Sequence, residues 1–399
     1  MMYVGKRTLE GAFAHFALIA ALPLLTLHCT GELGVEKESS GTGDKAAFAG
    51  LRLADTYSVG KNPLNMATGD FNGDGNLDLA VSNLGDGNPT HAFSVLLGNG
   101  DGTFQAATQV TTNVDSRSLA SGDLNGDGKL DLAVVTLDTG VGYVEIYLGN
   151  GSGGFAFERS INVGSGAWNL VLGRFNADAN LDMMVVVKTS TGKVVFYAGD
   201  GTGNFGSGTD YILGSFSTDL VSGDFNEDNK LDVAVVDWKA SDNLEILLGD
   251  GAGGFAVGGP YSVGNAPLRL TTADFDGDGK LDIATANMNS EDVTVMKGNG
   301  DGTFSLLDTF DGMDSPWSVE QGDFDEDGSI DLVVGNNSSW EMSFLKGSSG
   351  DFASPSQLTS PDEGLWDILS GDFDGDGHLD VVVSNSDSDS VTVFLSTWE

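Results

Sequence analysis

The sequence predicts an all-β protein folded as a seven-bladed β-propeller of four-stranded blades, and three observations support this expectation. An acidic phrase, first seen as "GDFNGDGNLDLAV" at residues 69–81, occurs seven times, and successive copies start 53, 51, 50, 50, 49 and 49 residues apart. Each interval holds four short β-type segments separated by turns, without a helical period over ten residues. Gly is abundant (58 of 399 residues) and Pro scarce (8), as many tight turns require. Four strands in each of seven repeats are typical of a propeller.

The fifth repeat shows the four expected strands most clearly. They read "LRLTTADF", "LDIATAN", "VTVMKG" and "FSLLDTF". A second, glycine-rich phrase follows the acidic one in six repeats, as "GNGDGTF" at residue 98, "GNGSGGF" at 149, "GDGTGNF" at 199, "GDGAGGF" at 249, "GNGDGTF" at 298 and the weaker "GSSGDF" at 347. We expect this phrase to form the turn between the third and fourth strands of each blade.

The two ends of the repeat region favour a closed ring. The last repeat ends at "VTVFLSTWE" and lacks the glycine-rich turn and fourth strand, whereas Leu51–Gly60, "LRLADTYSVG", reads like a fourth strand placed before the first repeat. We therefore expect the N-terminal strand to complete the last blade of a propeller domain spanning residues 48–399. The alternative, a solenoid, would need atypical capping repeats at its ends.

The N-terminus is typical of an export signal, which we expect to span residues 1–29. Lys6 and Arg7 precede the apolar segment Gly11–Leu27, and such a segment of about 17 residues is short for a membrane span. Residues 30–47 are polar, rich in Gly and Ser and aperiodic, so we expect a flexible linker there. The propeller is therefore expected outside the cytoplasm, at the cell surface or in the periplasm.

Cys29 raises the question of a lipid anchor. Its place after the apolar segment resembles a bacterial lipoprotein signal, in which the cysteine becomes the lipid-bearing N-terminus, although Leu27 and His28 depart from the small residues of that pattern. We expect lipidation at Cys29; the alternative is an ordinary signal peptide with an incidental cysteine. As the only cysteine, Cys29 also excludes an intrachain disulfide.

Each acidic phrase predicts a loop whose side chains converge on a cation. Counted from the first aspartate, positions 1, 3, 5 and 9 carry side-chain oxygens in six of the seven copies, and position 6 is Gly or Asn, which tolerate positive φ. Position 7 varies in chemistry, as a ligand supplied by the backbone carbonyl would allow. The predicted metal residues, loop by loop, are Asp70, Asn72, Asp74, Asn76 and Asp78; Asp123, Asn125, Asp127, Lys129 and Asp131; Asp224, Asn226, Asp228, Lys230 and Asp232; Asp274, Asp276, Asp278, Lys280 and Asp282; Asp323, Asp325, Asp327, Ser329 and Asp331; and Asp372, Asp374, Asp376, His378 and Asp380.

Calcium (Ca2+) is the cation that this donor set favours. Calcium accepts an irregular cage of six or more oxygens, whereas magnesium keeps its waters and requires a regular octahedron. Zinc and iron prefer nitrogen or sulfur ligands. The loop is not an EF-hand, because position 12 is Val81 in the first repeat and Thr285 in the fifth rather than glutamate. We expect six calcium ions, one for each complete loop; the alternative is acidic residues chosen only for turn geometry.

The third repeat departs from the pattern. It reads "GRFNADANLD", so that Arg174 replaces the first aspartate and Ala179 occupies position 6. We expect no calcium ion there. We further expect the Arg174 guanidinium to fill the vacant place and to pair with Asp178 and Asp182.

The acidic loops and the glycine-rich phrase ending in Phe make residues 51–399 resemble the FG-GAP/VCBS repeat proteins, whose best-known propeller is the N-terminal domain of integrin α subunits. The resemblance implies a seven-bladed ring, calcium in the loops, and ligands that dock on the face opposite these loops. The FG-GAP phrase itself is present only loosely, as in "VGNAPL", which leaves the subfamily open.

Tryptophans gather on the face opposite the acidic loops, which makes that face the expected ligand surface. One position in the link between blades lies six residues before each acidic loop, and it carries Arg or Trp in four repeats; two further Trp fall between the second and third strands. Exposed aromatic side chains with polar neighbours mark binding surfaces. The alternative is that these side chains turn inward and close the central channel. The candidate ligand residues are Arg117, Trp168, Trp238, Trp317, Trp340 and Trp366.

The expected function is a non-enzymatic binding or adhesion module for a protein or glycan ligand, acting as a monomer. The net charge of −41 excludes nucleic acid and anionic membranes as partners, apart from a membrane reached through an N-terminal lipid. An enzyme such as a polysaccharide lyase or esterase is one alternative, kept open by Asp219, Asp314 and Asp367, although histidines are few and no G-x-S-x-G motif occurs. A structural spacer in the cell envelope is the other.

Overall fold

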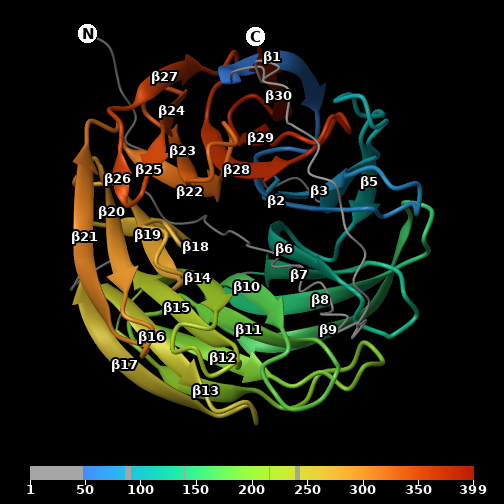
Figure 1. The fold of residues 1–399 in the computed structure, drawn as a ribbon. Helices are drawn as coiled ribbons and strands as arrows, with labels where there is room; N and C mark the ends of the chain where they lie inside the picture. The colour runs from blue at the N-terminus through green and yellow to red at the C-terminus, as the bar shows by residue number, and fades with distance from the viewer. Residues whose placement is uncertain (1–47, 86–90, 139, 215, 239–242) are drawn as a thin grey trace, which may run out of the picture.

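Seven four-stranded antiparallel sheets form a ring in the computed structural model, which describes residues 48–85, 91–138, 140–214, 216–238 and 243–399 (Figure 1). The predicted all-β, seven-bladed propeller is confirmed. Within the described residues no α-helix is present, and none of them forms a helix able to cross a membrane. The predicted signal (1–29), the linker (30–47) and Cys29 lie outside the described residues and stay predictions.

Each blade runs from an inner strand beside the ring axis to an outer strand on the rim. The strands, from inner to outer, are β2 (Pro63–Gly69), β3 (Asp78–Asn83), β4 (Ala92–Leu96) and β5 (Thr108–Thr111) in blade 1; β6 (Ser116–Gly122), β7 (Asp131–Asp138), β8 (Val141–Gly149) and β9 (Phe155–Gly164) in blade 2; β10 (Ala167–Gly173), β11 (Asp182–Val187), β12 (Lys193–Tyr197) and β13 (Thr209–Ile212) in blade 3; β14 (Ser217–Gly223), β15 (Asp232–Asp237), β16 (Asn243–Gly249) and β17 (Phe255–Ser262) in blade 4; β18 (Pro267–Ala273), β19 (Asp282–Asn287), β20 (Asp292–Gly298) and β21 (Phe304–Asp311) in blade 5; β22 (Pro316–Gly322), β23 (Asp331–Asn336), β24 (Glu341–Leu345) and β27 (Ser356–Thr359) in blade 6; and β28 (Leu365–Gly371), β29 (Asp380–Asn385), β30 (Ser390–Trp398) and β1 (Phe48–Ser58) in blade 7. A short hairpin, β25 (Gly347–Ser348) with β26 (Asp351–Phe352), lies between β24 and β27.

The ring closes where the two ends of the described chain meet. Strand β1 pairs antiparallel with β30 from Phe48 opposite Trp398 to Ser58 opposite Ser390, and it forms the outer edge of a sheet ordered β1-β30-β29-β28. Figure 1 shows this pairing as blue beside red at the rim. The predicted closure by the N-terminal strand agrees with this sheet, in which β1 supplies the fourth strand of blade 7.

Burial follows the position of a strand within its blade. The second strands, such as β3, β11 and β29, are buried along their whole length because both of their faces pack against neighbouring blades. Fourth strands such as β5 and β13 are mostly exposed. The core therefore consists of apolar clusters between adjacent blades, as where Ala133 and Val135 of blade 2 meet Met183 and Val185 of blade 3.

One face of the ring carries the acidic loops together with the glycine-rich turns, and backbone hydrogen bonds on this face join successive blades. The turn of blade 2 donates from Gly153 N to Phe71 O in the acidic loop of blade 1 at 3.0 Å. The same contact crosses the closure of the ring, where Gly102 N of blade 1 donates to Phe373 O of blade 7 at 3.0 Å. The acidic loops therefore lie at the joints between blades.

Candidate metal centres

The first acidic loop is held by its own side chains, which turn inward onto the backbone. The Asp70 carboxylate accepts hydrogen bonds from the amides of Gly73 (2.6 Å), Asp74 (3.0 Å) and Gly75 (2.9 Å). Asn72 Oδ1 accepts from Asp74 N at 2.8 Å. Gly73 and Gly75 have φ of +78° and +91°, which side chains with a Cβ adopt only with strain. The sequence therefore places its glycines where the loop needs them.

The aspartate at position 9 is fully buried in all seven loops. In blade 1, Asp78 is fully buried, and its carboxylate accepts from Phe71 N and from Gly98 N, both at 2.8 Å. Burial raises the pKa of this carboxyl group, although the two backbone hydrogen bonds lower it. Burial raises the pKa to about 6 at the equivalent Asp232, Asp282, Asp331 and Asp380.

The structure brings the aspartates at positions 1, 3 and 9 together in the three loops that carry aspartate at all three positions. In each group, one carboxylate oxygen per residue lies within 4.8 Å of the others. The groups are Asp274, Asp276 and Asp282; Asp323, Asp325 and Asp331; and Asp372, Asp374 and Asp380. Position 5, predicted from the sequence as a fourth converging ligand, does not belong to these groups: Asp278, Asp327 and Asp376 lie outside them.

Two lysines place a positive charge against these acidic groups. Lys297 Nζ donates to Asp276 and, at 2.7 Å, to Asp278. Lys346 Nζ makes the same pair of contacts with Asp325 and, at 2.9 Å, Asp327. The hydrogen bond from Lys297 lowers the pKa of Asp278. Sequence reasoning missed both lysines, although they stand out when the repeats are aligned, because their places are apolar in the other blades.

The donor set fits a hard divalent cation. All side-chain groups that converge at positions 1, 3 and 9 offer oxygen, the donor that calcium prefers. Asp323 Oδ1 is buried and accepts no hydrogen bond, so this oxygen is free to bind a cation. In blades 5 and 6 a lysine ammonium already contacts the position-3 carboxylate, as a cation would.

The variable residues at position 7 direct their side chains to other partners. Lys129, Lys230 and Lys280 pair with the position-5 aspartates at 3.0, 2.7 and 3.4 Å. His378 contacts Glu326 of blade 6 at 2.6 Å and stacks on Trp398. These contacts are compatible with a backbone ligand at this position, which remains a prediction along with the side-chain amides of Asn72, Asn125 and Asn226.

In blade 3 the predicted pairing of Arg174 with Asp178 and Asp182 is wrong. Arg174 Nε donates to Ala179 O at 3.0 Å, and Asn176 Nδ2 donates to Asp182 Oδ1 at 3.0 Å. The physical reason is local: a guanidinium cannot accept the loop amides that Asp70 accepts in blade 1, so it donates to the nearest loop carbonyl instead. The carboxylate at position 9 is satisfied without it.

The channel mouth opposite the acidic loops is closed by side chains. Trp168, Trp317 and Trp366 are 6–8% exposed and share one buried cluster with Leu64 and Leu268. Trp317 and Trp366 meet edge to face, with ring centroids 4.5 Å apart. The expectation that these side chains stand exposed around the mouth is therefore wrong, and the inward alternative describes them. The reason is convergence: inner strands from all blades meet at the axis, where large side chains reach one another.

Arg117 is also buried (4% exposed), with its guanidinium 4.2 Å from the centroid of the Trp168 ring. The Lys188 ammonium lies 3.8 Å from the Trp168 centroid and 4.4 Å from that of Trp238, which is half-buried. Trp340, 37% exposed, is the most accessible of the six candidate ligand residues. Of the six candidate ligand residues, Trp340 and part of Trp238 thus remain available to a ligand on this face.

Two of the carboxylates considered for catalysis join neighbouring blades. Asp367 of blade 7 accepts from Met66 N of blade 1 at 3.0 Å, and Asp219 of blade 4 accepts from Leu270 N of blade 5 at 3.1 Å. Both side chains are fully buried. Arg269, also fully buried, lies 3.6 Å from Asp367. Asp219 and Asp367 therefore join the inner strands of neighbouring blades.

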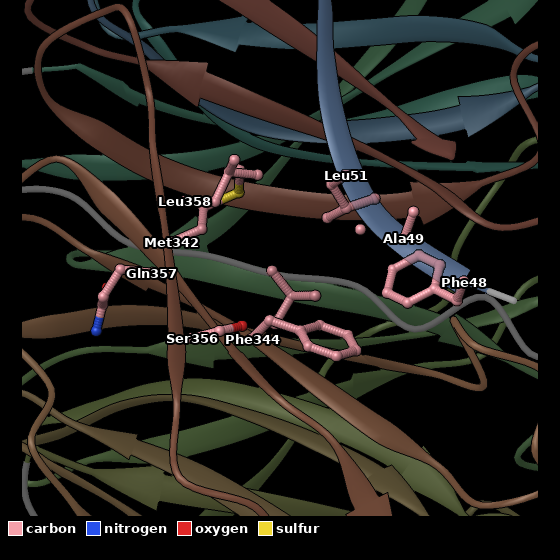
Figure 2. A pocket seen from close by; sticks show the side chains of 10 residues that line it. Phe48, Ala49, Leu51, Met342, Phe344, Ser356, Gln357 and Leu358 are labelled. Carbon is pink, nitrogen blue, oxygen red and sulfur yellow. The ribbon is translucent and has the colours of Figure 1, made fainter. Parts of the chain in front are cut away.

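A pocket that the sequence did not predict opens on the rim between blades 6 and 7. Figure 2 shows Phe48 and Leu51 of β1 facing Met342 and Phe344 of β24, with Leu358 of β27 beside them. Its volume is about 360 Å³, and most of its lining is apolar. The rings of Phe48 and Phe344 lie 5.6 Å apart. The pocket exists because β1 arrives from the distant N-terminal side of the chain to complete blade 7.

Comparison with known proteins agrees with the repeat assignment. The FG-GAP-like repeat family matches residues 70–134, 123–185, 174–235, 224–285, 274–334 and 323–383, and each match begins at position 1 of a loop. No curated protein matches the chain. Among solved structures, BBS1N in complex with ARL6DN, soaked with mercury or with lead, is similar, with a TM-score of 0.59 and 11% identity over 86% of this chain and 96% of that one. A functionally unknown protein from Desulfotomaculum acetoxidans DSM 771 has a TM-score of 0.55 and 13% identity over 74% of this chain and 86% of that one. At these identities the structures support the fold alone.

Proposed function

This chain belongs to the family of FG-GAP-like repeat proteins, and from that premise we propose that it is a calcium-stabilised propeller that binds a protein or glycan outside the cytoplasm without catalysing a reaction. The observation that carries the proposal is the grouping of carboxylates at positions 1, 3 and 9 in the acidic loops of blades 5, 6 and 7. Three carboxylates within 4.8 Å repel one another unless a cation lies among them. Calcium is the cation for which all-oxygen, irregular loops are suited.

Calcium in these loops would stabilise the joints of the ring. In five of the seven loops, the first residue after position 1 supplies the carbonyl that the next blade's glycine-rich turn contacts, as Phe71 does for Gly153. Asp78 at position 9 ties the same loop to the turn of its own blade through Gly98. An ion bound by the carboxylates of the loop would therefore hold three backbone segments in place, and we infer a structural role for it rather than a catalytic one.

The ligand surface that the chain retains is the face opposite the acidic loops, around Trp340 and Trp238. The buried Trp168, Trp317 and Trp366 would form the floor beneath it. Protein ligands are favoured by one comparison: the similar propeller BBS1N was solved in complex with ARL6DN. A role in catalysis is disfavoured because Asp219 and Asp367 are buried and bonded to backbone amides.

The proposed location rests on the sequence and on the calcium binding proposed above. The basic and apolar N-terminal segment predicts export. Calcium sites of extracellular modules typically have dissociation constants of about 0.1–1 mM, so they fill at the calcium concentrations found outside cells. Lipidation of Cys29 would hold the propeller at a membrane surface.

Binding to arrayed glycans and to arrayed surface proteins, measured with calcium and with EDTA, tests the proposed function. We expect calcium-dependent retention by a defined subset of the array, reduced by Trp340→Ala. Leu306→Ala is the matched control, because Leu306 is an exposed apolar residue on the outer strand β21 (62% exposed). Retention that Leu306→Ala reduces and Trp340→Ala does not would place the ligand on the rim, and an array without any retained ligand would favour the spacer alternative.

A further inference from the structure

One position beside the acidic loops divides the blades into two classes. It directly precedes the first glycine of the glycine-rich turn, whose amide bonds to the position-9 aspartate, so it lies next to the loop. In blade 7, where Ser396 N takes the place of that glycine, the same position can be assigned. The seven residues in order are Leu97, Leu148, Ala198, Leu248, Lys297, Lys346 and Leu395.

The leucines at this position pack against the next blade. Leu97 of blade 1 lies against Gly153 in the turn of blade 2, so closely that a Cβ on this glycine would stand 2.7 Å from the leucine side chain. Leu248 makes the same approach to Gly302. Leu395 packs on Gly102 across the closure of the ring. In these blades the position contributes apolar contact between neighbours.

The two lysines occur where that regular partner is missing. Blade 6, which follows Lys297, has the shortened turn "GSSGDF". Gly350 of this turn lies against Asp276 in the acidic loop of blade 5. Blade 7, which follows Lys346, has no glycine-rich turn. The lysine side chains are 30% and 47% exposed and reach back to the acidic loop of their own blade, where each contacts the aspartates at positions 3 and 5.

We propose that Lys297 and Lys346 act as built-in counter-ions that weaken calcium binding in blades 5 and 6. The proposal rests on the calcium binding inferred above. Asp276 and Asp325 belong both to the carboxylate groups suited to an ion and to the lysine contacts, so an entering ion competes with the ammonium for the same side chain. An ammonium that stays nearby repels the ion, and one that leaves loses two ion pairs. Either way the loop holds calcium less tightly.

Blade 7 provides the internal comparison. Its loop has aspartate at positions 1, 3, 5 and 9, like blade 5, and Asp372, Asp374 and Asp380 form the same group. Within the described part of the chain, no lysine pairs with these three residues. The site of blade 7 is therefore expected to fill at lower calcium concentration than those of blades 5 and 6, although the aspartates are the same. The chain would then gain rigidity in steps as calcium rises, with blades 5 and 6 ordered last.

The test is a calcium titration of the full chain against a chromophoric chelator, for wild type, Lys297→Leu, Lys346→Leu and the double variant. Leucine is the residue that blades 1, 2, 4 and 7 carry at this position, and circular dichroism checks that each variant is folded. We expect roughly tenfold tighter binding at one site in each single variant and at two in the double variant. Leu395→Lys in blade 7, whose loop has the same aspartates as blade 5, should produce the opposite effect at one site.

Lys193→Leu controls for the loss of a positive charge, since Lys193 pairs with Asp210 (2.7 Å) on outer strands away from the loops. Affinities that shift equally in Lys193→Leu and in the double variant would overturn the proposal, as would unchanged affinities in the double variant. Failure of wild type to bind calcium would instead overturn the proposed function, so the two results are distinguishable.

Discussion

The Asp78 carboxylate accepts a hydrogen bond from the Gly98 amide at 2.8 Å, and this bond ties the acidic loop of blade 1 to its glycine-rich turn. Equivalent bonds occur in all seven blades at 2.7–2.9 Å, with Ser396 N as donor to Asp380 in blade 7. Blade 3 has this bond although its loop lacks the first aspartate. The aspartate at position 9 is thus part of the propeller framework as well as a candidate metal ligand.

Replacing Asp78 with Ala should destabilise the protein even without calcium. The substitution leaves the amides of Phe71 and Gly98 buried without acceptors, and each such group costs about 1–3 kcal/mol. Urea unfolding in EDTA measures the loss, with Asp74→Ala as the control, because Asp74 is exposed and bonds within its own loop. Equal losses in the two variants would contradict the framework role of Asp78.

Restoring the missing ligand in blade 3 should create a calcium site. The variant Arg174→Asp with Ala179→Gly supplies the aspartate that the other six loops have at position 1 and the glycine that five of them have at position 6. Equilibrium dialysis with calcium analysis is expected to count one more ion than in wild type. The control Arg174→Ala with Ala179→Gly, which lacks the carboxylate, should bind the same number of ions as wild type. An unchanged count in the aspartate variant would show that blade 3 lacks more than its first ligand.

The tryptophans that close the channel mouth should behave as core residues. Trp317→Ala or Trp366→Ala removes a buried ring from the cluster at the axis, so unfolding free energy should fall by about 3–5 kcal/mol in each. Trp340→Ala, at an exposed side chain, should change it by less than about 1 kcal/mol. Chemical denaturation measures all three, and a stable Trp317→Ala variant would mean that the mouth is open to ligands after all.

Glu320 should give the protein a pH-dependent stability. Burial raises the pKa of this carboxyl group to about 8 from its usual value near 4.5, while the hydrogen bond from Ser370 lowers it. The folded state therefore binds a proton more tightly than the unfolded state, and stability should fall as pH rises from about 4.5 to about 8. Glu320→Gln should remove a slope on the order of 1 kcal/mol per pH unit across this range, whereas Glu363→Gln, at an exposed residue, should keep it. Parallel slopes in the two variants would assign the effect elsewhere.

The ring of seven blades could be predicted from the sequence because its acidic phrases recur at a regular period. Seven acidic phrases at near-constant spacing determine the blades, and the unpaired fourth strand around Leu51–Gly60 predicts the pairing of β1 with β30. Side-chain direction at the axis was not predictable from spacing, because the position of Trp317 faces the channel and its exposure depends on how far Trp366 reaches from the next blade.

Two other features depend on contacts between segments distant in sequence. Lys297 contacts Asp276 because the pairing of β19 with β20 in blade 5 brings the end of β20 back to the acidic loop that precedes β19. The rim pocket forms because Phe48 arrives beside Phe344, almost 300 residues later in the chain. Arg174 was misassigned because the nearest acceptor to its guanidinium is a backbone carbonyl, which a sequence does not display.

Thermal unfolding in saturating calcium and in excess chelator tests the central claim most directly. Ions that bind only the folded ring add to its stability by mass action, about 2.7 kcal/mol for each site at a hundredfold excess over its Kd. We predict a markedly higher melting temperature in calcium than in chelator, with six ions bound to each folded chain. The same melting temperature in both solutions would contradict the claim that the acidic loops are calcium sites that stabilise the propeller.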